Sequence, residues 1–226
     1  IFEQAGVICV NLVENMSNLA KAIDRAKLPL GKRLAVLTNA GGPAILTVDE
    51  AANCGLEIAE LSDKTQKKLR EIVVPEASVQ NPVDLLPPAT AEVYKKAAEI
   101  ILSDDNVDAG ILILGPPLMF DTVEITRCIC EAANQSGKCA IVVVMSQDEI
   151  IAEVAKQMPE HPPLFNSPEK AAWAISEMYR YKLRSESPEG KVKKFSVNTK
   201  GVRSIIGKYK QDGCSLDFND VYYILN

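Results

Sequence analysis

The sequence of 226 residues predicts an α/β fold in which a doubly wound parallel sheet lies between two layers of helices. Continuous runs of Val, Ile, Leu and Ala alternate along the chain with segments of helical periodicity. Strands that are covered on both faces have this continuous apolar character. A regular alternation of strands and helices is typical of a parallel sheet with crossover helices.

Apolar runs mark the strand candidates, which are residues 33–38, 55–60, 108–114, 138–145 and 163–165. The helix candidates follow them, at residues 44–53, 64–73, 91–102, 121–135, 148–157 and 169–183. Ser62 with Asp63, and Thr90, are placed to cap the second and third of these helices, and Gly137 follows the fourth. Residues 167–169 (SPE) supply a cap, a proline at the first helical position and an acidic first turn for the last helix.

Two flanking segments lie outside this alternating unit. The first contains an expected strand at 7–10 and an expected helix at 16–27, and we expect it to be the end of a preceding domain. After residue 184 the chain becomes polar, as linkers do, before two short expected helices at 199–210 and 218–225. The chain begins at Ile1 rather than Met, so we expect it to be part of a longer protein. The expected domains are residues 1–30, 31–184 and 185–226.

Charge, hydropathy and cysteine spacing argue against several classes of protein. The net charge of −5 argues against a general nucleic-acid binder, which would carry a basic face. No apolar run approaches the length of about 20 residues that a membrane span needs. Six cysteines occur, but no Cys-x-x-Cys pair does, and His161 is the only histidine. We therefore expect reduced thiols, no metal site and a cytoplasmic protein.

Two loops at the expected carboxyl ends of strands are candidates for ligand binding. Gly41 and Gly42 lie between a strand and a helix, where glycine permits close approach and the helix directs free N–H groups at a ligand. Gly115 follows the strand that ends at 114 and precedes Pro116 and Pro117. Together the two loops can hold one anion between two helix N-termini. The alternative is that both are ordinary strand–helix turns that need glycine for steric reasons.

A third segment, Asn81-Pro82-Val83-Asp84, is expected to be extended, because Pro82 disfavours the helical conformation for the residue before it. The segment can present Asn81 and Asp84 from an irregular strand. The alternative is a structural turn in which Asp84 accepts backbone hydrogen bonds.

Other polar and aromatic residues fit structural roles better. Asp104 and Asp105 suggest the acidic pocket of a response regulator, but they precede their strand and so lie at the amino end of the sheet. His161, in a loop before a strand, is expected at the surface, and Trp173 is expected to pack its helix onto the sheet. A stand-alone flavodoxin-like domain that binds FMN or a nucleotide is disfavoured, because no second aromatic residue is near to sandwich a flavin ring.

The ordered series of these motifs resembles the NDP-forming acyl-CoA synthetases, which include ADP-forming acetate–CoA ligase and are related to succinyl-CoA synthetase. The series consists of residues 38–43 (TNAGGP), 55–56 (GL), 59–62 (AELS), 81–84 (NPVD) and 107–109 (VDA), and residues 2–8 (FEQAGVI) resemble a segment near the end of the family's second domain. The resemblance covers about residues 1–183. It implies that 31–184 is a flavodoxin-like ligase domain in three α/β/α layers, and that 185–226 opens an ATP-grasp domain.

The resemblance also implies an activity. The family interconverts acyl-CoA, ADP and phosphate with the acid, CoA and ATP, through an acyl phosphate and a phosphorylated histidine. Ligase domains hold that phosphohistidine between helix N-termini. On this likeness Gly41, Gly42 and Gly115 supply the backbone approach, Asn39 is a side-chain donor, and Asn81 and Asp84 support the site.

The catalytic histidine of the family lies in a His-Thr-Gly-type motif, which would be upstream of Ile1; His161 does not match it. The chain departs from the family again at Ala44, where many relatives carry glycine. We expect the fragment alone to be inactive, without a cofactor of its own, while the whole enzyme binds CoA, ADP or ATP, and Mg. Its expected partners are the CoA-binding and ATP-grasp domains or subunits, in an oligomer. The alternative function is a catalytically inert, ligand-sensing module of a larger acyltransferase.

Overall fold

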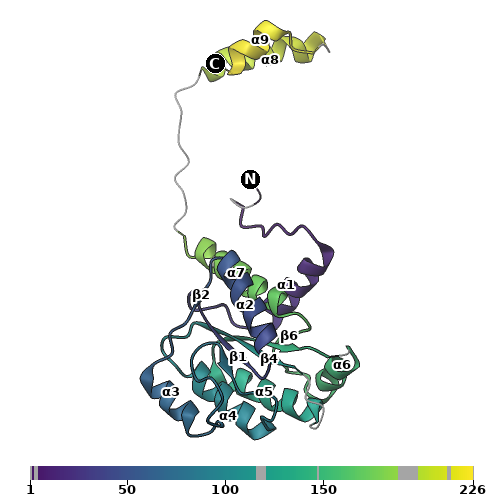
Figure 1. Ribbon diagram of the computed structural model, residues 1–226. Coiled ribbons are helices and arrows are strands. Elements are labelled where there is room, and N and C mark those ends of the chain that lie inside the picture. The colour runs from purple at the N-terminus through teal and green to yellow at the C-terminus, as the bar shows by residue number, and fades with distance from the viewer. Residues whose placement is uncertain are drawn as a thin grey trace. The chain divides into compact units, whose positions relative to one another are not determined.

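The computed structural model describes residues 2, 5–115, 121–146, 148–187, 198–212 and 215–225. The chain divides into two compact units, Ile1–Ser187 and Pro188–Asn226, which are described separately below (Figure 1). The first unit contains the sheet and the helices that cover it.

The sheet is parallel and doubly wound, as the sequence predicts. Its strands are β1 (Arg33–Thr38), β2 (Glu57–Ile58), β3 (Val83–Asp84), β4 (Ala109–Leu114), β5 (Cys139–Val144) and β6 (Leu164–Phe165). They lie in the order β2-β1-β4-β5-β6, with β3 paired to β1, and every strand pair is parallel. Apart from β3, this is the strand order of the flavodoxin-like class, with the order reversing between β1 and β4.

Helices cover both faces of the sheet, which gives three layers (Figure 1). The helices of this unit are α1 (Val13–Arg25), α2 (Gly41–Asn53), α3 (Asp63–Arg70), α4 (Ala91–Leu102), α5 (Thr122–Ser136), α6 (Asp148–Gln157) and α7 (Pro168–Ser185). Buried residues of α1, α2 and α7 form one apolar cluster with one face of the sheet. Buried residues of α3, α4, α5 and α6 form a second cluster with the other face. The continuous apolar runs of β4 and β5 are fully buried because they face both clusters.

The capping residues act as the sequence predicts. The side chains of Ser62, Thr90 and Ser167 accept hydrogen bonds from the N–H groups of Thr65, Val93 and Lys170, at the starts of α3, α4 and α7. Gly137 ends α5 with a φ of 72°, a left-handed conformation that glycine adopts without a steric penalty.

The N-terminal flank differs from the expectation in two ways. Residues 7–10 do not form a strand, because no neighbouring strand is available to satisfy their backbone hydrogen bonds. The helix begins earlier than expected, at Val13, and its buried Leu19 and Ala22 join the cluster that includes α7. The described part of the flank packs in the same compact unit as the sheet, and the expected domain boundary at residue 30 stays a prediction.

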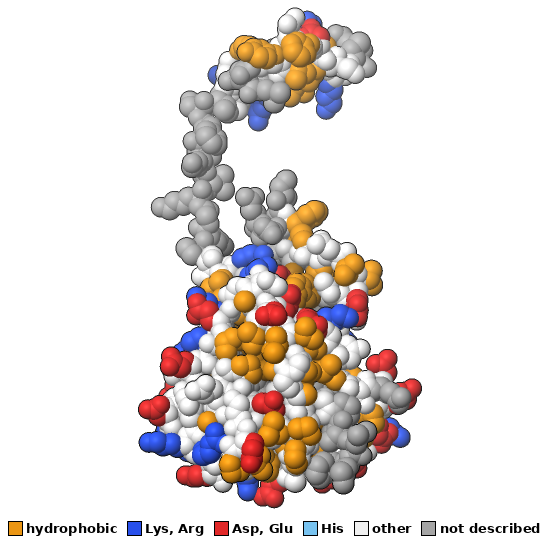
Figure 2. Space-filling model, in the orientation of Figure 1, with side chains coloured by type: hydrophobic (Ala, Val, Ile, Leu, Met, Phe, Trp, Pro, Cys, Tyr) orange, Lys and Arg blue, Asp and Glu red, His pale blue; other side chains and the backbone are white. Residues whose placement is uncertain are grey.

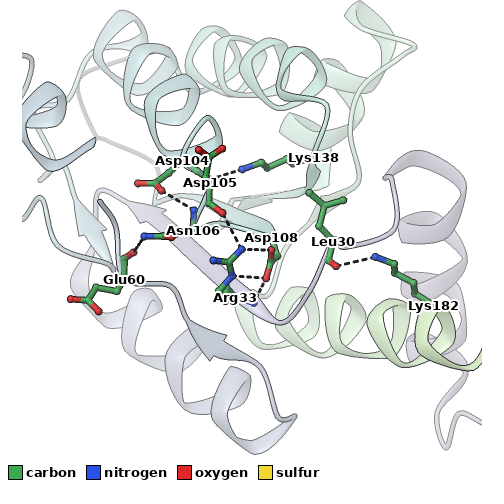
Figure 3. A network of polar contacts seen from close by, with 9 residues as sticks. All are labelled: Leu30, Arg33, Glu60, Asp104, Asp105, Asn106, Asp108, Lys138 and Lys182. Atoms are coloured by element: carbon green, nitrogen blue, oxygen red, sulfur yellow. Dashed lines mark hydrogen bonds and ion pairs between the residues drawn. The ribbon is translucent and has the colours of Figure 1, made fainter. Parts of the chain in front are cut away.

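The amino edge of the sheet is closed by a polar network (Figure 3). The Arg33 guanidinium donates hydrogen bonds to both carboxylate oxygens of Asp108, at 2.9 and 2.8 Å, and to the Asp105 carbonyl oxygen at 2.9 Å. The Arg33 hydrogen bond holds the pKa of Asp108 below its ordinary value of 3.8. Gly31 is required beside it, since a Cβ there would lie 2.4 Å from an Asp108 carboxylate oxygen.

Asp104 belongs to the same edge. Its carboxylate accepts the N–H groups of Ser62 and Asn106, at 2.8 and 2.9 Å, and Lys138 donates to its carbonyl oxygen. The expectation that Asp104 and Asp105 lie at the amino end of the sheet is confirmed, because both precede β4.

The described residues of the second unit form α8 (Thr199–Asp212) and α9 (Phe218–Leu225). The Tyr209 hydroxyl lies 3.0 Å from an Asp217 carboxylate oxygen and 2.6 Å from an Asp220 carboxylate oxygen, and hydrogen bonding to these acceptors, to Asp220 above all, raises the pKa of Tyr209 to about 12. Phe218, Tyr222 and Tyr223 are exposed. Within the described part of the chain, no helix has the length and apolar character needed to cross a membrane.

Candidate functional site

The candidate site lies at the carboxyl edge of the sheet, between β1 and β4. At this point the strand order reverses, so the chain leaves β1 toward α2 on one face and leaves β4 toward α5 on the other (Figure 1). In open α/β sheets, ligands bind at such switch points. Residues 38–42 and Gly115 meet here, as the sequence predicts.

The N-terminus of α2 is open. The helix begins at Gly41, not at 44 as expected, because proline is tolerated in the first turn of a helix and Pro43 therefore lies inside it. The cap residue, Ala40, offers no side-chain acceptor, and the first turn contains no acidic residue. The first N–H groups of a helix have no partner within it, and Pro43 has none to donate. Gly41 and Gly42 are thus the residues whose N–H groups point out of this helix end.

Nothing in the described structure requires glycine at position 42. Neither Gly41 nor Gly42 has a positive φ. A Cβ at Gly42 would have no atom within 4 Å, and one at Gly41 would lie 3.6 Å from an Asp84 carboxylate oxygen, an ordinary contact. Both glycines are exposed. No described residue fills the space beside Gly42.

Asn39 and Gly115 bind each other. The Asn39 amide donates to the Gly115 carbonyl oxygen at 2.7 Å and accepts the Gly115 N–H at 2.8 Å. A Cβ at Gly115 would lie 3.3 Å from both the Asn39 side-chain oxygen and the Ala40 Cβ, so a larger residue there would make these neighbours shift by a few tenths of an ångström. We expected Asn39 to donate to a ligand and Gly115 to admit one. These hydrogen bonds join the loop after β1 to the end of β4, and the second N–H of the Asn39 amide has no partner among the described residues, so the donor role of Asn39 stays a prediction. Pro116 and Pro117 lie outside the described residues.

Asn81 fills a gap beside β1. The strands β2 and β3 pair with opposite ends of β1, at Arg33–Leu34 and at Leu37–Thr38 respectively. Between them the Asn81 amide accepts the Val36 N–H at 2.9 Å and donates to the carbonyl oxygens of Leu34 and Ala59, at 2.8 and 2.9 Å. Its side chain thereby replaces a segment of strand and fixes the end of β1 from which α2 departs.

Asp84 faces the α2 N-terminus from β3. One carboxylate oxygen accepts the N–H of Leu86 at 2.9 Å, and the other is the atom nearest to a Cβ built on Gly41. A carboxylate beside the positive end of a helix dipole is in a favourable position. Both earlier interpretations of the segment hold in part, because Asp84 is a turn acceptor and also borders the helix end.

Tyr94 is a buried polar residue that the sequence did not single out. It is fully buried in α4, its hydroxyl donates to the Ile113 carbonyl oxygen at 2.9 Å, and burial raises its pKa well above the ordinary value. Asp84 adds to that shift, which places the carboxylate close to Tyr94. A tyrosine at helical spacing resembles any other core residue, so its partner in β4 could not be found without the fold.

Apolar side chains lie next to the open helix end. Ile45 and Leu46 of α2 are 63% and 45% exposed, and Figure 2 shows apolar side chains gathered over the region of α2. Exposed apolar side chains that gather in one area are typical of surfaces that contact other protein segments.

The remaining candidates lie elsewhere. The His161 Nδ1–H donates to the Pro162 carbonyl oxygen at 2.7 Å, in the loop that precedes β6 at the amino edge. Trp173 packs against the cluster of α7 and the sheet, as expected. The described cysteines are all free, and Cys214 lies outside the described residues. Among the described residues, no group of three or more His, Cys, Asp or Glu is arranged to hold a metal ion.

Comparison with known proteins relates this geometry to a family. Residues 34–184 match the profile of the Ligase-CoA domain. An ADP-forming acetate–CoA ligase II subunit alpha of Pyrococcus furiosus is 36% identical over 177 residues, which cover 76% of this chain and 38% of that protein. A crystal structure from Pyrococcus horikoshii OT3 matches with a TM-score of 0.75 at 30% identity, over 82% of this chain and 43% of that one.

The dinucleotide-forming acetyl-coenzyme A synthetase 1 of Candidatus Korarchaeum cryptofilum matches with a TM-score of 0.73 at 26% identity, over 81% of this chain and 41% of that one. This chain therefore spans less than half the length of each of these three proteins.

Proposed function

The chain belongs to the Ligase-CoA domain family of NDP-forming acyl-CoA synthetases, and from this premise we propose that it is part of an acid–CoA ligase. The whole enzyme would interconvert acyl-CoA, ADP and phosphate with the acid, CoA and ATP. In the first step phosphate displaces CoA from the thioester and forms an acyl phosphate. A histidine then takes the phosphoryl group, which releases the acid, and passes it to ADP.

The role of this chain would be to hold the phosphohistidine at the N-terminus of α2. The observation that supports this role is the open helix end at the switch point, with two exposed glycines and no side-chain cap. The free N–H groups and the helix dipole favour a phosphate dianion there. The empty space over Gly42 permits the histidine, carried by another segment, to bring its phosphate against the backbone.

The other predicted site residues would position this helix end. Asn39 ties the α2 loop to Gly115, and Asn81 fixes the end of β1. The Asp84 carboxylate borders Gly41, so its negative charge would oppose the binding of a dianion at this helix end. No described residue of this chain would act as the phosphorylated group.

The remaining chemistry would come from other domains or subunits, which bind CoA, the nucleotide and Mg. The apolar surface at Ile45 and Leu46 would contact one of them. We propose the cytoplasm as the compartment, since free thiols persist there. The 226-residue chain by itself would not turn over substrate.

The complete gene product, labelled with radioactive phosphate in the presence of acetyl-CoA, tests the proposal. We expect an acid-labile, alkali-stable label of the kind that phosphohistidine gives. The variant Gly42→Asp places a carboxylate where the phosphate would bind, and we expect it to reduce labelling by at least about tenfold, or about 1.4 kcal/mol. An aspartate in the first turn stabilises a helix, so this loss would not come from unfolding.

Gly42→Asn is the matched control, since its side chain has the same size without the charge. We expect it to retain much more labelling than Gly42→Asp. Equal losses in the two variants would refute a phosphate site at this helix end. A complete protein that folds but neither labels nor turns over would refute the ligase assignment and favour the ligand-sensing module.

A further inference from the structure

A second pocket lies at the other end of the sheet's carboxyl edge. It has a volume of about 390 Å³ and is lined by residues of α1, the first turns of α6 and the end of β6. These elements lie together in Figure 1, with α1 above β6 and α6 beside it. The strand β5 separates β6 from the switch point between β1 and β4, so the pocket is distinct from the proposed phosphate site. Its volume falls within the range of small-molecule sites.

The strongest indication of a ligand is Asn18. Its side chain lines the pocket and is only 8% exposed, yet its amide forms no hydrogen bond with any described residue. The amide is therefore unpaired within the described chain and open to the pocket, where a ligand that enters can form hydrogen bonds with it.

Two opposite charges face the pocket from different helices. The Lys21 ammonium of α1 lies 5.8 Å from the centre of the Phe165 ring and forms no ion pair within the described part of the chain. Asp148, the first residue of α6, likewise has no described ion-pair partner. Glu14, by contrast, is paired with Lys170 and so contributes no free charge. The unpaired charges of the pocket therefore sum to zero.

We propose that this pocket binds a small zwitterion of the α-amino acid class. Lys21 and an N–H of the Asn18 amide would bind the carboxylate, while Asp148 and the Asn18 amide oxygen would accept from the ammonium group. Ile151 and Leu164 line the same pocket and would contact the ligand side chain. A zwitterion matches both charges, whereas a simple anion would leave Asp148 unpaired and repelled.

Isothermal titration calorimetry on the 226-residue chain tests the proposal, with the twenty proteinogenic L-amino acids as probes. We expect saturable binding of at least one of them with a millimolar or lower Kd. The matching carboxylic acid without the amino group should bind at least about tenfold more weakly, because it lacks the charged hydrogen bond to Asp148. Equal binding of acid and amino acid would overturn the zwitterion assignment, and no binding by any probe would overturn the site.

The variant Asn18→Leu separates a binding role from a structural one. We expect its melting temperature to stay close to that of the wild type, because the Asn18 amide forms no hydrogen bond with a described residue, while amino-acid binding falls at least about tenfold. Lys21→Met should weaken binding similarly, and Lys67→Met on the exposed surface of α3 is its matched control with unchanged affinity. Unchanged binding in Asn18→Leu, or an equal loss in Lys67→Met, would refute the proposal.

Discussion

The polar groups at the two edges of the sheet differ in whether they have partners within the fold. At the amino edge, Arg33 and Asp108 neutralise each other, and Asp104 accepts two backbone N–H groups. At the carboxyl edge, the amides of Asn39 and Asn81 bind backbone groups and hold the end of β1, and the α2 N-terminus that follows has no side-chain cap. The side chains close the first edge and leave the second open.

Because of this difference, the candidate binding groups of the sheet are backbone N–H groups rather than side chains. A cluster of carboxylates at the amino edge attracts attention in the sequence, yet its partners are all within the fold (Figure 3). The carboxyl edge presents the N–H groups of Gly41 and Gly42, which no side-chain motif reveals. The following predictions test whether side-chain hydrogen bonds stabilise both edges of the sheet, while only the carboxyl edge has groups free to bind a ligand.

The largest expected effect is that of Asn81→Ala. The variant removes three hydrogen bonds and leaves backbone groups of Val36, Leu34 and Ala59 without them, so we expect a loss of about 2–4 kcal/mol in the free energy of unfolding. Urea denaturation measures it. Gln80→Ala, at the exposed neighbouring position, should change stability by less than about 0.5 kcal/mol. Similar values for both variants would mean that Asn81 does not support the carboxyl edge.

We expect Asp108→Asn to have the next largest effect on stability. It breaks the charge-assisted pairing with Arg33 at the amino edge, and we expect a loss of about 1–3 kcal/mol. Asp105→Asn is the control, because Arg33 contacts the carbonyl oxygen of Asp105 and not its exposed carboxylate. If Asp105→Asn destabilises the protein as much as Asp108→Asn, the amino edge is not closed by the described ion pair.

Glycine replacement sharpens the comparison at the carboxyl edge. Gly115→Ala should destabilise the protein by about 1–2 kcal/mol, because its Cβ would press on Asn39 and Ala40. Gly42→Ala should leave stability unchanged or raise it by less than about 1 kcal/mol, since its Cβ enters open space and alanine favours helix. Thermal unfolding of both variants measures these stability changes. A Gly42→Ala variant less stable than the wild type would show that Gly42 has a structural role within the chain.

The smallest effect concerns pH. Because the folded state lowers the pKa of Asp108 below 3.8, its contribution to stability is complete above that pH and is lost as pH falls through the lower, folded pKa. The stability difference between wild type and Asp108→Asn should therefore shrink below about pH 3.8. Denaturation at pH 3 and pH 6 measures this, and a difference that grows in acid would contradict the ion pair.

The fold was largely predictable because β4 and β5 are buried on both faces, and their continuous apolar runs carry that information locally. The prediction of a strand at 7–10 was wrong, because an apolar run forms a strand only beside another strand. The start of α2 was missed because glycine disfavours helix, although it is acceptable in a first turn. Asn81 could be identified as a candidate but not explained, since its partner Val36 is 45 residues away in the chain.

The most direct test of the open helix end is a titration of the isotope-labelled chain with inorganic phosphate, observed through its backbone amide resonances. Chloride at equal ionic strength is the control. The account predicts saturable, phosphate-specific shifts at Gly41 and Gly42, with millimolar affinity because one helix end supplies only half of the clamp, and no shifts at Asp108 or Gly110 on the amino side. Absence of shifts at both glycines, or equal shifts at the two edges, would contradict it.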